Sequence, residues 1–546
     1  MWAVSSLPAQ ADAVVIGAGP NGLVAANALV DAGWDVVVLE AEDTVGGAVR
    51  SAEITSPGFV TDLFSAFYPL AAASPIIRDL ELERHGLTWV HAPEVLAHAL
   101  DDGRAALLSR NPERTAASVD EFAAGDGDAW MTMFRQWERL RDPLLDALFT
   151  PLPPVRSMLQ LLRRTGTAEG LDLARLAVLP VRRLAQERFS GSGAGLLLTG
   201  NALHSDVPPD AAGSGAFGWL LAMLGQDVGF PVPLGGAQRL ADALAARVEA
   251  GGGQVYPGAA VTEVLVAAGR AVGVRTLDGS LVRAQRAVLA DVSAPALYGE
   301  LIRSDHVPDP VRRNLSRFQL DWPTLKVNWA LDRAVPWTAS SVRGAGTVHL
   351  GVDDHGFVDM AASLSKGEAP ERPFVLFGQM STADPTRSPA GTESAWAYTH
   401  VPLEIAADAQ ALGEQVKRVE DAVERVAPGF RGVVRDRSVQ TPTDLEEADA
   451  NLICGSINGG TSALHQQVVF RPMSGTGRPH TPIINLYLAS ASAHPGGGVH
   501  GACGWNAARC ALSDAGPMGG VRRAMHRTVW RRLLGKPQPG GDRPPR

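Results

Sequence analysis

The sequence has little cysteine, no excess of positive charge and no long apolar run. Its three cysteines, Cys454, Cys503 and Cys510, form no C-x-x-C pair, which excludes a redox-active disulfide of the thioredoxin-reductase type. Three thiols are also too few for a disulfide scaffold, so we expect a reducing compartment. The net charge of −9 disfavours nucleic acid as a partner, because nucleic-acid binding requires a basic surface.

No segment has the character of a membrane-spanning helix or of a secretory signal. The uncharged stretch 479–508 is broken by Pro482, Pro495 and several glycines, and such backbone would leave its polar groups unpaired in lipid. The first ten residues lack a basic region followed by an apolar core. We therefore expect a cytoplasmic protein.

Two basic segments leave peripheral contact with a membrane open. Arg156–Arg188 carries seven arginines against three acids, interleaved with apolar residues. In the tail 516–546, apolar residues recur at every fourth position among arginines. Both patterns are typical of helices that lie on an anionic lipid surface, and both are also typical of a solvated helical face.

The most informative stretch of the chain is a dinucleotide-binding pattern near the N-terminus. An apolar run at 13–16 is followed by G-x-G-x-x-G at 17–22, a helical pattern at 23–32 and a second β-branched run at 36–39. A glycine motif with its strand, helix and second strand in order is far more specific than the glycines alone.

Each glycine of this motif has a physical role. Gly17 allows the tight turn, Gly19 lets the backbone approach a pyrophosphate, and Gly22 lets the helix pack against the strand. Glu40 ends the second strand, where its carboxylate can accept a hydrogen bond from a ribose hydroxyl. An acid at this position favours FAD or NAD over NADP.

Two further glycine-rich segments predict close approach of the backbone to the same ligand. Gly46-Gly47 lies shortly after Glu40, and Arg50 follows where it can meet phosphate or carboxylate charge. Near the C-terminus an apolar run leads into three glycines at 496–498 and then a helical pattern. A helix N-terminus there would stabilise the negative charge of a reduced flavin. A glycine cluster at 191–195 is not preceded by a strand pattern, so we interpret it as a helix start or turn.

The order of these patterns predicts an α/β fold. We expect a discontinuous Rossmann-like FAD-binding domain and an α+β substrate domain that carries a helical insertion. The helical patterns in the insertion include 118–147, 155–164 and 171–186, and short strands are expected at 281–283 and 287–291. The predicted segments are 11–73, 230–295 and 442–515 for the three parts of the FAD-binding domain, 74–229 for the helical insertion, 296–441 for the substrate domain and 516–546 for the basic tail.

The motifs resemble those of a known superfamily. G-A-G-P-N-G-L at 17–23 and L-E-A-x-D-x-x-G-G-x-x-R at 39–50 resemble the N-terminus of FAD-dependent enzymes of the phytoene-desaturase and amine-oxidase type. A-H-P-G-G-G-V-x-G at 493–501 resembles the closing motif of bacterial and fungal phytoene desaturases. With looser matches between them, the resemblance covers all but the first ten and about the last thirty residues.

The resemblance implies that FAD is the cofactor and assigns its contacts. Gly17, Gly19 and Gly22 would hold the pyrophosphate and Glu40 the ribose, while the backbone of Val261 would contact the adenine. The remaining cofactor-binding residues would be Pro20, Asn21 and Ala41 beside these, Gly46, Gly47 and Arg50 in the continued cradle, and Gly497, Gly498 and Val499 by the flavin ring.

Two residues are candidates for catalysis, and no metal-ligand pattern is expected. His494 precedes the flavin-facing glycines and can serve as acid or base; the alternative is a histidine bonded to backbone in a tight loop. Lys326 resembles the lysine that holds a water near the flavin in amine oxidases; the alternative is a surface or ion-paired lysine.

These observations support an FAD-dependent oxidoreductase of the dehydrogenase or desaturase type, which transfers a hydride from an apolar organic substrate to flavin. A carotenoid desaturase acting on phytoene is an alternative. A flavin-binding protein with a regulatory role, or a non-redox isomerase that uses reduced flavin, is a further alternative. The substrate, the electron acceptor and the oligomeric state do not follow from the sequence.

Overall fold

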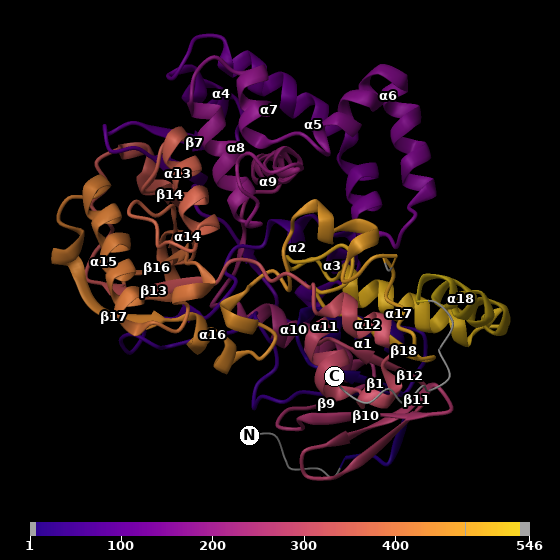
Figure 1. The fold of residues 1–546 in the computed structure, drawn as a ribbon. Helices are drawn as coiled ribbons and strands as arrows, with labels where there is room; N and C mark the ends of the chain where they lie inside the picture. The colour runs from indigo at the N-terminus through magenta and orange to yellow at the C-terminus, as the bar shows by residue number, and fades with distance from the viewer. Residues whose placement is uncertain (1–6, 476, 535–546) are drawn as a thin grey trace, which may run out of the picture.

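The structure is a computed structural model that describes residues 7–475 and 477–534 (Figure 1). The first of its two large sheets belongs to the dinucleotide domain. The strand order in this sheet is β10-β11-β12-β1-β2-β9, with β18 beside β12. The strands are β1 (Gln10–Ile16), β2 (Val36–Leu39), β9 (Gln254–Tyr256), β10 (Val261–Ala267), β11 (Arg270–Thr276), β12 (Leu281–Ala290) and β18 (Leu486–Leu488).

Parallel pairing explains why these strands come from distant parts of the chain. β1 pairs in parallel with β2 and β12, and β12 pairs in parallel with β18. Their continuous apolar runs suit strands that are covered on both faces. Helices α1 (Pro20–Asp31), α10 (Gln238–Ala250) and α17 (Ala502–Ala515) pack on one face, and apolar residues of the segment 294–311 pack on the other. The discontinuous domain is therefore confirmed. The two strands predicted at 281–283 and 287–291 form one long strand, β12, because its first half pairs with the hairpin strand β11.

The second sheet forms the substrate domain, with the order β17-β13-β16-β15-β14-β6-β7. Helix α15 (Ala409–Val426) packs its apolar side on this sheet. Strands β6 and β7 lie within 74–229, where only helices were predicted. They pair with each other, and β6 also pairs with β14; such distant pairing leaves no local pattern. The strands are β6 (Glu94–Ala99), β7 (Ala105–Leu108), β13 (Thr324–Leu331), β14 (Ala345–Leu350), β15 (Val375–Gln379), β16 (Glu393–His400) and β17 (Val434–Gln440).

The helical insertion lies at the top of Figure 1, beside the substrate sheet, and the dinucleotide sheet lies at the bottom. The predicted helix 118–147 is in fact two helices, separated by a turn in which Gly125 has φ 95°. The helical pattern at 171–186 is divided at Pro180, which lies between α6 and α7, as the helix-breaking character of proline predicts. The segment 191–195 opens α8, as interpreted from the sequence. The helices are α4 (Pro112–Asp120), α5 (Asp126–Phe149), α6 (Val155–Leu176), α7 (Val181–Arg188), α8 (Gly193–Leu203) and α9 (Ser214–Asp227).

Shorter elements connect these parts. They are β3 (Ser51–Ala52), β4 (Thr61–Asp62), α2 (Pro69–Ala73), α3 (Pro75–Asp79), β5 (Trp89–Val90), β8 (Val232–Pro233), α11 (Ala294–Ala296), α12 (Asp309–Leu315), α13 (Asp354–Ser365), α14 (Met380–Ala383) and α16 (Pro442–Ala448). Helix α18 (Gly519–Leu534) covers the described part of the basic tail; residues 535–546 and 1–6, on which the tail and signal predictions also fell, lie outside the described residues. None of the helices in the described part of the chain is long and apolar enough to cross a membrane.

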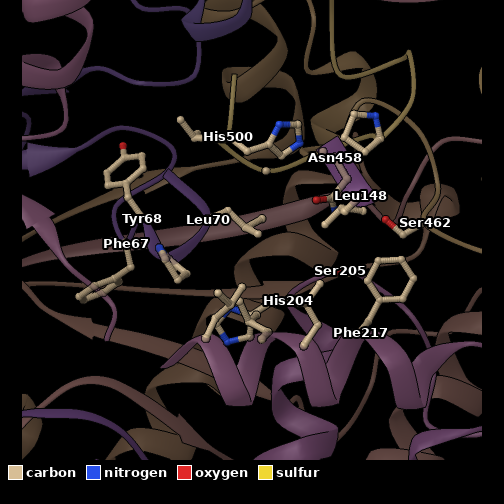
Figure 2. A pocket seen from close by; sticks show the side chains of 18 of the residues that line it. Phe67, Tyr68, Leu70, Leu148, His204, Ser205, Phe217, Asn458, Ser462 and His500 are labelled. Carbon is tan, nitrogen blue, oxygen red and sulfur yellow. The ribbon is translucent and has the colours of Figure 1, made fainter. Parts of the chain in front are cut away.

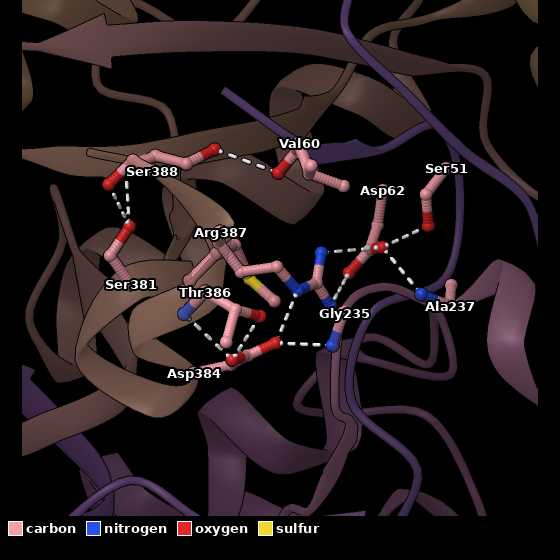
Figure 3. Close-up of polar contacts among 12 residues, drawn as sticks. Ser51, Val60, Asp62, Gly235, Ala237, Ser381, Asp384, Thr386, Arg387 and Ser388 are labelled. Carbon is pink, nitrogen blue, oxygen red and sulfur yellow. Dashed lines mark hydrogen bonds and ion pairs between the residues drawn. The ribbon is translucent and has the colours of Figure 1, made fainter. Parts of the chain in front are cut away.

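A buried cluster of ion pairs joins the two domains (Figure 3). The Arg387 guanidinium contacts both carboxylate oxygens of Asp62, at 2.9 and 3.0 Å, and one oxygen of Asp384 at 2.9 Å. All three side chains are fully buried. Asp62 also accepts from the backbone amide of Ala237, and Asp384 accepts from that of Gly235. The cluster therefore connects β4 and the start of α10 with the segment between β15 and β16.

We predict that Arg387→Met lowers stability by about 3–5 kcal/mol, because it leaves two buried carboxylates without their cation. The midpoint of urea unfolding, followed by tryptophan fluorescence, measures this loss. Arg182→Met is the matched control, since Arg182 pairs with Asp210 at the surface and such pairs contribute about 0–1 kcal/mol. Equal midpoints for the two variants would contradict a structural role for the buried cluster.

Candidate functional site

The turn between β1 and α1 is shaped for a phosphate group. Gly17 has φ 91°, in the left-handed region that favours glycine. A Cβ on Gly22 would lie 2.2 Å from the carbonyl oxygen of Gly17, so only glycine lets the helix start this close to the strand. The first turn of α1 directs its free amides toward this loop, where an anion is stabilised. In the structure the amide of Gly22 donates to the Asp291 carboxylate at 2.7 Å.

Glu40 braces this loop from the end of β2. Its carboxylate accepts from the amide of Ala18 at 2.6 Å and from that of Glu42 at 3.0 Å. Burial raises the pKa of Glu40 above its ordinary value. Its contact with a ribose remains a prediction. The backbone amide of Ala259 donates to the Glu40 carbonyl. Val261 lies two residues after Ala259, at the start of β10.

The second glycine segment lies directly against the first. The Gly46 amide donates to the Ala18 carbonyl at 2.9 Å, and a Cβ on Gly47 would lie 3.3 Å from the Cα of Gly19. Arg50 uses its guanidinium to bind the backbone carbonyls of Gly47 and Ala448. It therefore ties the cradle to the third part of the domain, and its predicted contact with a ligand anion remains a prediction.

A cavity of about 290 Å³ opens at this cradle and extends to the substrate sheet. Its wall is built by all three parts of the dinucleotide domain together with β13, β15 and β16. The predicted cofactor residues that line it are Gly19, Pro20, Asn21, Gly47, Gly497, Gly498 and Val499. Gly17, Gly22, Glu40, Ala41, Gly46, Arg50 and Val261 lie outside the lining, because they shape the loops behind it or, for Val261, begin a neighbouring strand.

The residues present fit an FAD-type dinucleotide. Asn21 Oδ1 is buried in this wall without a hydrogen-bond partner, which is an atom that a ligand can satisfy. A Cβ on Gly497 would lie 2.8 Å from the Asn458 carbonyl oxygen, so position 497 in the loop before α17 has no room for a side chain. Helix α17 begins just beyond this loop, after Gly501, so the positive end of its dipole lies close to the loop.

Two acids in the wall were not predicted as site residues. Asp291 follows β12, at the carboxyl end of a parallel strand, where α/β proteins bind ligands; that position was the available signal. Asp449 follows α16 and has no comparable signal. Burial, and then the nearby Asp449 and Glu40 carboxylates, raises the pKa of Asp291 to about 8.

Lys326 lies in the same cavity, on β13, with only 3% of its surface exposed. It is not a surface lysine, and it makes no ion pair among the described residues. Its ammonium donates to the backbone carbonyl of Asp62 and lies 5.5 Å above the ring centre of Trp396. Burial lowers the pKa of Lys326 to about 7, so the group can gain or lose a proton near neutral pH.

His494, the other catalytic candidate, does not reach the cavity. It is buried, with 7% of its surface exposed, and it lies outside the lining of both cavities described here. Burial lowers its pKa to about 4. The sequence placed it correctly next to the glycine loop, but the loop turns so that Gly497, Gly498 and Val499 face the cavity in its place.

A second, inner cavity of about 210 Å³ adjoins the first (Figure 2). The two share Phe67, His204, Asn458 and the loop 497–499, so a molecule in the inner cavity meets the glycine loop directly. The inner wall is mostly apolar, with Leu70, Leu148, Phe217, Leu220, Leu221, Leu224 and Phe230. No local pattern marks these residues, which come from α2, α5, α9 and the segment before β8.

The comparisons with known proteins agree with this site. The family model for flavin-containing amine oxidoreductases matches residues 21–512. The chain belongs to this family. The resemblance to phytoene desaturases and amine oxidases is thereby confirmed, and the protein is an FAD-dependent oxidoreductase.

Similar curated proteins span nearly the whole chain. A mouse relative, pyridine nucleotide-disulfide oxidoreductase domain-containing protein 2, is 31% identical over 93% of this chain and 94% of its own. A subunit of the limonene dehydrogenase of Castellaniella defragrans is 24% identical over 93% and 95%. The neurosporene-forming phytoene desaturase of Rhodobacter capsulatus is 24% identical over 89% and 91%.

Solved structures show the same fold. An oxidoreductase from Methanosarcina mazei has a TM-score of 0.60 at 15% identity and covers 92% of this chain and 99% of its own. A triple mutant of putrescine oxidase has a TM-score of 0.59 at 17% identity, with coverage of 92% and 98%.

We predict that Gly22→Ala abolishes FAD binding by this oxidoreductase, since the added methyl group would overlap the Gly17 carbonyl. Flavin released on denaturation and measured by its visible absorbance gives the bound amount per chain. Gly413→Ala on α15 is the control, because a Cβ there meets no other atom within 4 Å. A thermal unfolding curve separates flavin loss from unfolding, and full flavin content in Gly22→Ala would overturn the assignment.

We predict that the effect of Lys326→Met on stability depends on pH. The folded state has a Lys326 pKa of about 7 and the unfolded chain one of about 10.4. Between these values the unfolded state binds the extra proton, so the wild type gains stability as pH rises, and the variant lacks this gain. The stability of the variant relative to wild type should be constant below about pH 7 and should fall above it.

Urea unfolding from pH 6 to pH 9 measures this difference. Lys366→Met provides the control, because Lys366 is exposed and pairs with Glu368 at the surface. A pH-independent difference between wild type and Lys326→Met would show that Lys326 does not titrate in this range.

Proposed function

We propose that this protein is a dehydrogenase or desaturase that transfers a hydride from an apolar organic substrate to FAD. The observation that carries the proposal is the inner cavity, whose mostly apolar wall opens onto the glycine loop 497–499. Two relatives support it by their names, the limonene dehydrogenase and the phytoene desaturase. Limonene and phytoene are both hydrocarbons.

Different residues of the two cavities bind the substrate, stabilise charge and hold a proton in such a reaction. Bound FAD would supply the acceptor for two electrons and a hydrogen. The apolar side chains of the inner wall orient the substrate and exclude water. The backbone at 497–499 and the N-terminus of α17 stabilise negative charge at the end of the cavity. Lys326 holds or moves a proton at its Nζ, because burial lowers its pKa to about 7.

The volume of the inner cavity bears on whether the substrate is a small molecule or a carotenoid. Its volume of about 210 Å³ lies below the range of about 300–1,000 Å³ typical of sites for drug-sized ligands. A small substrate therefore fits better than a 40-carbon carotenoid. No particular residue supports a regulatory role or an isomerase role. Unlike the proposed reaction, neither role consumes electrons.

The test is the visible spectrum of the purified protein. We expect the absorbance bands of oxidised flavin, and we expect anaerobic addition of a small apolar substrate to bleach them. Stable bands across a broad substrate panel would favour a regulatory role, and product formation without net bleaching would favour isomerisation. Coloured polyenes after expression in phytoene-producing cells would favour the carotenoid desaturase. A colourless protein that takes up no flavin on reconstitution would overturn the proposal.

We also propose that helix α6 makes peripheral contact with an anionic membrane. The backbone of α6 is kinked at Gly166 (φ 64°). Met158, Leu159 and Leu162 before the kink and Leu171 after it are about half exposed or more. Arginines 156, 163 and 164 lie among them, so lipid phosphate would meet positive charge. Leu148, in the wall of the inner cavity, lies at the end of α5 just before this helix, which puts the contact beside the substrate site.

The double variant Leu159→Glu/Leu162→Glu should reduce cosedimentation with vesicles of phosphatidylcholine and phosphatidylserine at least severalfold. The control is Leu277→Glu, a similarly exposed leucine in the turn between β11 and β12. Equal sedimentation of wild type and double variant, or no sedimentation of wild type, would argue for a solvated helical face.

A further inference from the structure

The inner cavity contains no residue with a formal charge among the described residues that line it. Its polar side chains are Tyr68, His204, Ser205, Asn458, Ser462, Gln467 and His500, and the Tyr68 hydroxyl is hydrogen-bonded to Ser65. Figure 2 shows Asn458 and Ser462 on one side of the cavity, with the aromatic rings of Phe67 and Tyr68 on the other. An ammonium or carboxylate group placed here would have no partner of opposite charge, and burying an unpaired charge is very costly.

The hydrogen-bonding state of His204 follows from its neighbour. Its Nε2 lies 2.8 Å from Nε2 of His349, so one proton lies between the two rings. His349 is fully buried, and its Nδ1 has no hydrogen-bond partner. A Cβ on Gly200 would lie 2.1 Å from that atom, because the backbone of α8 packs against it. A proton on Nδ1 would therefore be a buried donor without an acceptor, which is strongly disfavoured.

The proton consequently sits on His349 Nε2 and is donated to His204 Nε2. His204 is neutral, because burial and then nearby His400 lower its pKa to about 3. A neutral imidazole that accepts at Nε2 carries its own proton on Nδ1. Since His204 lines both cavities, this N–H is available to a ligand as a donor.

Asn458 is held so that it offers a ligand an acceptor, where His204 offers a donor. Its side-chain nitrogen donates to Asp206 at 2.7 Å, and Asp206 in turn lies 2.7 Å from His400 Nε2. Its backbone amide donates to Asp321 at 2.9 Å. One N–H of the side-chain nitrogen is thereby used, and the amide oxygen, which has no hydrogen-bond partner among the described residues, is available to a ligand as an acceptor. Ser205 and Ser462 add hydroxyls with no partner among the described residues, and these donate or accept as required.

We propose that the inner cavity binds a neutral, mainly apolar molecule that carries one alcohol or carbonyl oxygen, with His204 Nδ1–H as the donor to that oxygen. The inference rests on the function proposed above, and it narrows the substrate from any apolar compound to an oxygen-bearing one. His204 acts here as a binding residue, and His349 acts as a positioning residue that selects its tautomer.

The test uses small aromatic probes that differ only in their polar group. Isothermal titration calorimetry of the flavin-loaded protein at pH 7.5 compares ethylbenzene, acetophenone, 1-phenylethanol, the 1-phenylethylammonium ion and benzoate. One or two neutral hydrogen bonds predict that acetophenone and 1-phenylethanol bind about tenfold more tightly than ethylbenzene. The two ions should bind more weakly than ethylbenzene. Equal affinity for ethylbenzene and acetophenone, or tightest binding of an ion, would overturn the proposal.

A variant identifies the donor. His204→Phe should bring the affinity for acetophenone down to that for ethylbenzene, while His204→Gln, which keeps an N–H, should retain part of the preference. His355→Phe is the matched control, since His355 is an exposed histidine on α13. If His204→Phe keeps the full wild-type preference for acetophenone over ethylbenzene, His204 is not the donor. The visible spectrum reports flavin separately, so failure of the oxidoreductase proposal is distinguishable from failure of this one.

Discussion

The buried Asp62–Arg387–Asp384 cluster is the constraint on which the active site depends. The cavity is made by two sheets that share no strand, so its shape requires a fixed relation between them. Fully buried ion pairs are satisfied only in one geometry, because each donor and acceptor needs its partner in place. Asp62 also links the cluster to the chemistry, since its backbone carbonyl accepts from Lys326. The lysine therefore depends on the domain interface for both its location and its pKa.

The two cavities differ in polarity. The cofactor-side cavity contains Asp291, Asp449 and Lys326, which suits a dinucleotide with phosphate and ribose groups. The inner cavity contains only neutral side chains, and its polar atoms are oriented by hydrogen bonds from behind, as His349 does for His204. The loop 497–499 is the boundary where both kinds of surface meet. A neutral substrate next to a charged cofactor is what this division of polarity favours.

The sequence by itself determined the cofactor class, the discontinuous dinucleotide domain and most of its glycines. Those features depend on local backbone geometry, in which Gly17 and Gly22 have no substitute, and on runs of apolar residues that form parallel strands. It also directed attention to Lys326, through resemblance to a family. The placement of β6 and β7 in the substrate sheet, however, depends on pairing with β14, more than 200 residues away in the chain, which no local pattern encodes.

Only the tertiary structure decided which residues face the substrate. His494 and Val499 are five positions apart, yet one is enclosed behind the loop and the other lines both cavities. His204, Asn458 and Asp291 come from three distant segments. His204 and Asn458 do not stand out from their neighbours in the sequence, and only its position at the end of a strand marks Asp291. Their roles arise from burial and from partners on other elements, because desolvation and hydrogen bonding act between residues that only the folded chain brings together.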